Sequence, residues 1–356
     1  MKSKIPCRTL GPALLVIGWL LISSGLVMAA DQETNVNADF EAGFYYTVQK
    51  GDTLWDLSQR FSDTPWQWPD LWRENKQIPN PHWIYPGDRI RLYRKTGQYR
   101  PEGTVTSAVP AAAPDVQAAA VEKRPKPQVD FLYSNIDRVG FIRNPIVKPL
   151  GVIFKSLDDK KLISRDDTVY IRYPAEGKVV EFKPGMRLTV YRNLDPLKGD
   201  ITQGTESGTQ HYLLGVVEIT KSEADHAMAK VVQSFRAILI GDKVMMYEPM
   251  SPIVRVVDSP PGIKGTLIAS EDHTKMMGDL YIAFIDKGID DHIAPGQVYS
   301  IYYQETVPLG VGKQTTTLNP VDIGSCLVLR AEKNASTVVI TSSSRKISAG
   351  QPFRTP

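Results

Sequence analysis

The chain has 356 residues, with 42 lysines and arginines against 39 aspartates and glutamates and a formal net charge of +3. Three of the basic residues lie in the first eight, so the rest of the chain is formally neutral and does not suggest nucleic-acid binding, which needs a basic surface. A length of this order predicts two or three domains, and two cysteines exclude a disulfide-rich scaffold.

The first thirty residues have the pattern of a secretory signal. Lys2, Lys4 and Arg8 precede an apolar run over residues 13–28, and small residues follow at positions 29 and 30. We therefore expect residues 1–30 to be a cleaved signal peptide and the protein to be periplasmic. The alternative is a retained membrane anchor, but the run is shorter than the ~20 residues that a spanning helix needs. No transmembrane span is expected after cleavage, and Cys7 precedes the apolar run, which disfavours a lipid anchor.

A short segment dense in Trp and Tyr follows a predicted N-terminal extension over residues 31–45. Tyr46–Val48 predicts a strand, and Thr53 predicts the cap of a helix whose apolar face carries Leu54, Leu57 and Phe61. Pro69 suits the first turn of a second helix ending near residue 75. A Tyr-Pro-Gly-Asp turn over residues 85–88 then leads to a closing strand. The predicted order is β-α-α-β.

Two separated motifs in this segment, "YTVQKGDTLW" and "NPHWIYPGD", resemble those of the LysM family, with the predicted domain covering residues 46–93. The resemblance implies a small α+β fold that binds N-acetylglucosamine-containing glycans of peptidoglycan in a shallow groove between two loops. The implied lining is Gly51, Asp52, Thr53 and Leu54 on one wall and Asn80, Pro81, Ile84 and Tyr85 on the other.

Each of these residues also has a purely structural interpretation. Glycine and proline at positions 51, 86 and 87 suit tight turns, and Leu54 suits the core. Thr53, Asn80 and Ile84 are the better contact candidates. Among the additional tryptophans, those at positions 68 and 72 are expected to pack between the helices, whereas the sequence leaves the roles of Trp66 and Trp83 open.

Residues 94–129 are rich in Pro and Ala and predict a flexible linker. The remainder predicts a mainly-β region built from two copies of one unit, residues 130–249 and 250–356, because several offsets agree. The matches pair "GVIF" at 151 with "GTLI" at 265, "DTVYI" at 167 with "GDLYI" at 278, the Pro-Gly pairs ending at 185 and 296, "GVVEI" at 215 with "GSCLVL" at 324, and Arg236 with Arg345. The expected fold class is thus multidomain, a LysM domain followed by a duplicated β region.

A catalytic site is not apparent. Cys326 in "IGSCLVLR" suggests a nucleophile, but it aligns with Val217 in a strand of the other copy, and no histidine precedes it closely. The five histidines are isolated, so no metal site or other cofactor is expected. We expect a binding protein rather than an enzyme. The alternative is a peptidoglycan-remodelling enzyme with an unrecognised site in the C-terminal region.

The order of LysM domain, linker and β region resembles that of the type IV pilus secretin-associated proteins. Their second domain is similar to the C-terminal domain of the flagellar protein FlgT, and here the stretch "GDLYIAFIDKGIDDHIAPGQVYSIY" and the residues after it carry that likeness. The resemblance implies a protein that tethers an outer-membrane secretin ring to peptidoglycan. The doubling of the β region departs from this pattern.

Overall fold

The structure is a computed structural model that describes residues 42–62, 64–92, 128–174, 181–194, 208–308 and 315–356. The predicted signal peptide, most of the N-terminal extension and nearly all of the predicted linker lie outside these residues. Among the helices of the described ranges, none has the length and apolar character required to cross a membrane.

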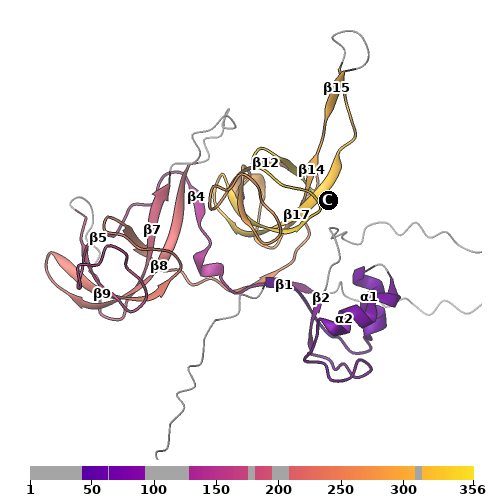
Figure 1. The fold of residues 1–356 in the computed structure, drawn as a ribbon, viewed down its shortest axis with the longest axis horizontal. Helices are drawn as coiled ribbons and strands as arrows, with labels where there is room; N and C mark the ends of the chain where they lie inside the picture. The colour runs from indigo at the N-terminus through magenta and orange to yellow at the C-terminus, as the bar shows by residue number, and fades with distance from the viewer. Residues whose placement is uncertain (1–41, 63, 93–127, 175–180, 195–207, 309–314) are drawn as a thin grey trace, which may run out of the picture. The chain divides into compact units, whose positions relative to one another are not determined.

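The first folded segment, which we call the βααβ domain, spans residues 42–92 (Figure 1). Strand β1 (Ala42–Thr47) pairs antiparallel with β2 (Arg89–Leu92). Between them lie α1 (Leu54–Ser62), the 3₁₀ turn η1 (Pro65–Gln67) and α2 (Trp68–Arg73). The predicted element order is confirmed, but β1 begins at Ala42, inside the predicted N-terminal extension. Residues 42–45 lack the alternation of buried and exposed positions that marks a strand in a sequence, because the first exposed residue of β1 is Thr47.

The sheet of this domain does not end at its own strands. Strand β3 (Val129–Tyr133) pairs with the other edge of β1, from Ala42 opposite Tyr133 to Tyr46 opposite Val129. Strand β11 (Ile253–Arg255) pairs with β3, giving the order β11-β3-β1-β2. The first strand after the predicted linker therefore lies in the same sheet as the βααβ domain. Residues on both sides of the predicted linker thus meet in one sheet, and Val129, predicted to lie in the linker, lies in a strand.

The chain then enters a first barrel. After the 3₁₀ turn η2 (Ile136–Arg138) and β4 (Phe141–Arg143), the strands are β5 (Gly151–Ser156), β6 (Thr168–Arg172), β7 (Arg187–Leu194), β8 (Thr209–Ser222), β9 (His226–Ser234) and β10 (Lys243–Met246). Their order is β8-β7-β10-β5-β6-β9, and β9 pairs back onto β8, which closes the ring. Apolar side chains such as Ile153, Leu188 and Val217 fill its interior.

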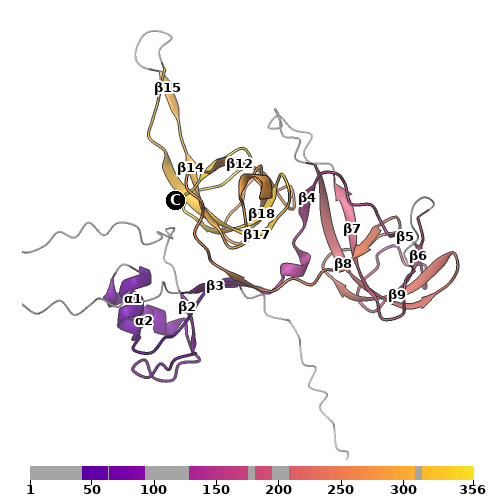
Figure 2. The ribbon, with the colours of Figure 1, turned by 180° about the vertical axis from the view of Figure 1, so that it is seen from behind.

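A second closed barrel follows, and Figure 2 shows it from behind. Its strands are β12 (Lys264–Ser270), β13 (Ile282–Ile285), β14 (Val298–Tyr303), β17 (Val321–Ala331), β18 (Ser336–Ser343) and β19 (Pro352–Arg354), and the 3₁₀ turn η3 (Ile289–Asp291) lies between β13 and β14. Between β14 and β17 stands the separate hairpin β15 (Thr306–Pro308) and β16 (Thr315–Thr317). The core includes Leu267, Tyr299, Cys326 and Phe353.

Both barrels have the same strand order when their strands are numbered along the chain. Each strand of the first barrel corresponds to one strand of the second, in chain order: β5 to β12, β6 to β13, β7 to β14, β8 to β17, β9 to β18 and β10 to β19. The register agrees as well, since Gly215 pairs with Ser234 and Gly324 with Ser343. One predicted match is wrong by three residues. The sequence matched Val169 with Leu280. In the structure Val169 pairs with Ala229, and the corresponding pair in the second barrel is Ala283 with Val338. The counterpart of Val169 is therefore Ala283.

Candidate functional site

The first predicted wall, residues 51–54, is a turn built around the carboxylate of Asp52. Gly51 adopts a φ of +94°, which favours glycine. One oxygen of Asp52 accepts hydrogen bonds from the Tyr46 hydroxyl at 2.7 Å and from the Gln49 N–H at 2.8 Å. Burial, together with this carboxylate, raises the pKa of Tyr46 to about 12. Asp52 is therefore engaged in shaping the loop, and the sequence alone gave no sign of this partnership.

Thr53 and Leu54, the other two residues of this wall, have different roles. The Thr53 hydroxyl accepts the N–H of Asp56 at 3.1 Å and donates to the Asp56 carboxylate at 2.7 Å, which caps helix α1 as predicted. Its side chain is exposed, so it also faces solvent at the loop. Leu54 is only 2% exposed and packs in the core. Leu54 can thus contribute to a ligand site through its backbone but not through its side chain.

The second predicted wall, residues 80–85, is held by its own turns. The Asn80 side-chain oxygen accepts the N–H of His82 at 3.0 Å, and the Asn80 carbonyl accepts the N–H of Trp83 at 3.0 Å. The N–H of Tyr85 donates to the Asp88 carboxylate at 2.8 Å. Pro81 is half-buried within these turns. These bonds fix the backbone without using the rings of the exposed side chains.

The exposed surface of this second wall is aromatic and uncharged. Ile84 is half-buried and packs against the core, whereas Tyr85 is 63% and Trp83 65% exposed. Large rings are usually buried unless they meet a partner. Trp83, whose role the sequence left open, is therefore the strongest addition to the predicted lining. Trp68 and Trp72 pack against the core, in agreement with expectation.

The two walls are joined at their bases. The N–H of Val48 donates to the Asp88 carbonyl at 2.8 Å, and the N–H of Gly87 donates to the Val48 carbonyl at 2.9 Å. These bonds continue the β1–β2 ladder between the segment that precedes the first wall and the turn that follows the second. The two predicted walls consequently belong to one fixed scaffold rather than to independent loops.

The buried Asn75 holds the chain between α2 and the second wall. Its side-chain nitrogen donates to the carbonyls of Leu71 and Arg91 at 2.7 and 2.8 Å, and its oxygen accepts the N–H of Arg91 at 2.7 Å. The indole of Trp72 donates to the Ile78 carbonyl at 2.8 Å. The helix was predicted to end near Asn75, whereas the anchoring role of this side chain was not predicted. Asn75 follows α2 and lies among the polar residues Arg73, Glu74, Lys76 and Gln77, so no local pattern marks it.

Cys326 is the nucleophile candidate that the sequence suggested in the C-terminal region. Cys326 lies in β17, is fully buried, and has its pKa raised to about 12 by burial. Such a thiol is neither accessible nor ionised near neutral pH, unlike a nucleophilic cysteine. Within the described ranges, no three His, Cys, Asp or Glu side chains gather in a way that would hold a metal ion.

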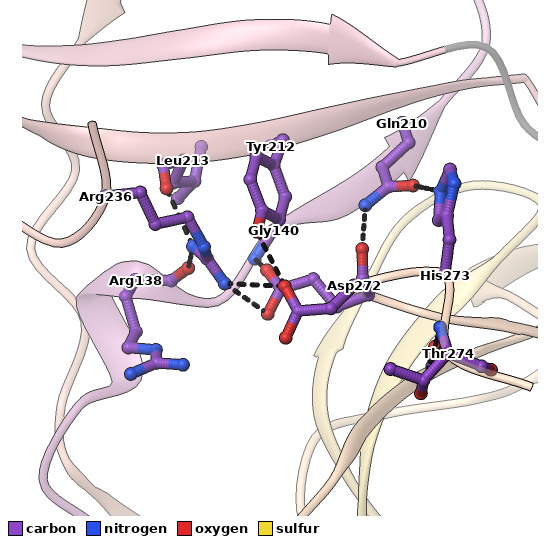
Figure 3. A network of polar contacts seen from close by, with 11 residues as sticks. Arg138, Gly140, Gln210, Tyr212, Leu213, Arg236, Asp272, His273 and Thr274 are labelled. Atoms are coloured by element: carbon purple, nitrogen blue, oxygen red, sulfur yellow. Dashed lines mark hydrogen bonds and ion pairs between the residues drawn. The ribbon is translucent and has the colours of Figure 1, made fainter. Parts of the chain in front are cut away.

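One buried polar network joins the two barrels (Figure 3). Glu271, after β12, is 2% exposed and accepts the N–H of Gly140 at 2.6 Å and a guanidinium N–H of Arg236 at 2.8 Å. The Gln210 side chain donates to the Glu271 carbonyl at 2.8 Å and contacts His273 at 2.6 Å. Burial raises the pKa of Glu271. Both carboxylate oxygens of Glu271 accept hydrogen bonds from protein donors. The network therefore has a structural role in joining the two barrels.

Comparison with known proteins identifies the first domain. The family model of the LysM domain matches residues 46–92. These residues form a LysM domain. A LysM domain implies binding to peptidoglycan and related N-acetylglucosamine glycans, which is the predicted ligand class. The match concerns the first domain and leaves the function of the barrels to be inferred.

One curated relative is the uncharacterized protein YqbP of Bacillus subtilis (strain 168). It is 40% identical over 57 residues, which cover 13% of this chain and 26% of that protein. The chain thus spans about a quarter of the length of this relative, and the likeness is local.

Proposed function

We propose that this protein is an exported, non-catalytic component of the cell envelope that binds peptidoglycan through its LysM domain and a protein assembly through its β region. The observation that carries the proposal is the LysM match over residues 46–92, joined with the uncharged aromatic surface of Trp83 and Tyr85. An acetylated amino sugar is itself uncharged, with an amide that backbone groups can pair and a ring face that aromatic side chains can cover.

Within the LysM domain we place the glycan between the two walls. Thr53 and Asn80 supply polar edges, and Ile84, Tyr85 and Trp83 supply apolar cover. Asp52 shapes the first loop through Tyr46 and Gln49, so its charge is already engaged. Binding by a single shallow site is expected to be weak, and several copies around an oligomeric partner would add avidity.

The β region is the proposed holder of the partner, and its two barrels are proposed to descend from one duplicated unit. Support comes from the common strand order and from matched glycines. A Cβ on Gly215 would lie 2.3 Å from the Gln233 carbonyl oxygen, and one on Gly324 would lie 2.5 Å from that of Ser342. The partner proposed is an outer-membrane secretin ring of a type IV pilus machine, on the domain order that resembles its associated proteins.

Sedimentation of the full-length protein with purified, insoluble peptidoglycan tests the binding proposal. Point variants suit this test better than deletion, because β1 of the LysM domain pairs with β3 and removing it would expose a sheet edge. We expect Tyr85→Ala to weaken retention about tenfold, the loss typical of truncating an important aromatic contact. Tyr303→Ala is the matched control, since Tyr303 is 42% exposed and lies outside the LysM domain. Equal retention of both variants would contradict the placement of the site.

The remaining parts of the proposal have separate tests. Recovery of a secretin with the tagged protein from envelope extracts, after crosslinking, supports the partner, and its absence counts against it. Incubation with peptidoglycan is expected to release no soluble fragments. Release by the wild-type protein would establish the alternative of a remodelling enzyme.

A further inference from the structure

Two further tryptophans of the LysM domain lie in solvent without belonging to either wall. Trp55 is 42% exposed and Trp66 is 76% exposed. Their ring centroids are 4.9 Å apart, with an angle of 76° between the ring planes. Trp68 and Trp72, close in sequence, pack against the core instead. Exposing two neighbouring indoles to water is unfavourable unless a ligand covers them.

The position of the pair follows from the first wall. Trp55 comes directly after Leu54 and is the second residue of α1. Trp66 lies in η1, which is fastened to α1 by the buried Ser58, whose hydroxyl donates to the Thr64 carbonyl at 2.9 Å. Trp55 therefore lies at the start of α1, directly after the first wall, and Trp66 lies on a short turn anchored to the same helix. The pair is close in sequence to one side of the proposed glycan site between the two walls, which we call the notch.

The geometry of the pair suits a sugar ring. Two indoles at nearly a right angle form a corner with two uncharged apolar faces. A pyranose offers a flat apolar face of C–H groups with hydroxyl groups at its rim, so such a corner can cover it without pairing any charge. A phosphate or an acidic peptide would gain little from the same surface, because neither ring supplies a cation to pair with a negative charge.

We propose that Trp55 and Trp66 form a second glycan subsite, which takes further sugars of an N-acetylglucosamine-containing chain whose first units occupy the notch. This inference rests on the proposed function and names a longer glycan chain as the substrate class. The notch alone serves a short oligosaccharide, and the tryptophan pair adds affinity only when the chain is long enough to reach it.

The test compares glycans of two lengths on the full-length protein. Isothermal titration with the trimer and the hexamer of N-acetylglucosamine measures both affinities for wild type, Trp66→Ala and Trp66→Phe. We expect Trp66→Ala to lower hexamer affinity about tenfold and to leave trimer affinity unchanged. Trp66→Phe keeps an aromatic face and should restore most of the loss. Because Trp66 is highly exposed, the Trp66→Ala protein should unfold at the same thermal midpoint as the wild type.

Tyr85→Ala separates this inference from the proposed function, since it should weaken both oligosaccharides. An unchanged ratio of hexamer to trimer affinity in Trp66→Ala, with trimer binding still dependent on Tyr85, overturns the second subsite and leaves the notch intact. In that case the pair is free to serve a protein partner. Failure of wild type to bind either oligosaccharide overturns both the subsite and the notch.

Discussion

Arg236 and Glu271 form a buried ion pair, 2.8 Å long, between the two barrels. The arginine follows β9 of the first barrel, and the glutamate follows β12 at the start of the second. The same guanidinium donates to the carbonyls of Arg138 and Leu213 at 3.0 and 2.7 Å. One side chain thus satisfies groups on three segments, which makes the pair the best place to test how the barrels are joined.

Removing the arginine should destabilise the protein strongly. Arg236→Met leaves the Glu271 carboxylate buried without its cation, a change that typically costs roughly 3–5 kcal/mol. Urea unfolding at pH 7 measures the loss. Arg345→Met is the matched control, because Arg345 occupies the equivalent place in the second barrel and is exposed. Adding Glu271→Gln to Arg236→Met should recover part of the stability, and equal loss in both arginine variants would contradict the role of the pair.

The matched glycines of the barrels make a second prediction. Gly215→Ala and Gly324→Ala should each lower the free energy of unfolding by about 1–3 kcal/mol, because the new methyl group would press on a backbone carbonyl of the neighbouring strand. Thermal unfolding of the two variants measures the effect. Gly278→Ala is the control, since its Cβ would lie 3.9 Å from the nearest atom. A harmless substitution at either glycine would show that the barrels are not packed alike.

Stability should also depend on the protonation of His211. This buried ring stacks on Phe141 and accepts the N–H of Val147 at 3.1 Å, and burial lowers its pKa to about 4. The unfolded chain binds a proton near pH 6.5, whereas the native state binds it only near 4. Stability is therefore full above pH 6.5 and is lost as the pH falls toward 4, by roughly 3 kcal/mol.

The variant His211→Gln keeps an acceptor for Val147 but cannot titrate. Its unfolding midpoint in urea should fall less between pH 7 and pH 4.5 than that of the wild type. His292→Asn is the control at an exposed histidine whose φ of +65° asparagine tolerates. Parallel pH profiles for wild type and His211→Gln would refute the assignment.

Cys326 provides a fourth prediction. With its pKa raised to about 12 and its side chain fully buried, the thiol should react with a disulfide reagent at pH 8 roughly a thousandfold more slowly than a free cysteine. The measurement uses the Cys7→Ser variant, so that Cys326 is the sole thiol. Unfolding in guanidinium should restore full reactivity. Rapid modification of the native protein would reopen the case for a nucleophilic site.

The sequence by itself determined the features that depend on neighbouring residues. The turn at Gly51, the cap at Thr53 and the Pro-Gly turns need only a few adjacent residues, so their motifs were sufficient to predict the βααβ order. The likeness between the two barrels was also visible in the sequence, because offsets such as that of Gly215 and Gly324 recur along the chain. The three-residue error at Leu280 arose where an apolar run offers several registers, and only strand pairing chooses among them.

Tertiary structure alone decided which distant segments meet. Nothing local in Ala42–Tyr45 or Val129–Tyr133 specifies that β1 pairs with β3, because a strand edge accepts many partners. The contacts of Asn75 with Arg91 and of Arg236 with Glu271 likewise join residues far apart in the chain. The exposure of Trp55, Trp66 and Trp83 beside the burial of Leu54 also required the fold, since a side chain's access to solvent depends on everything packed around it.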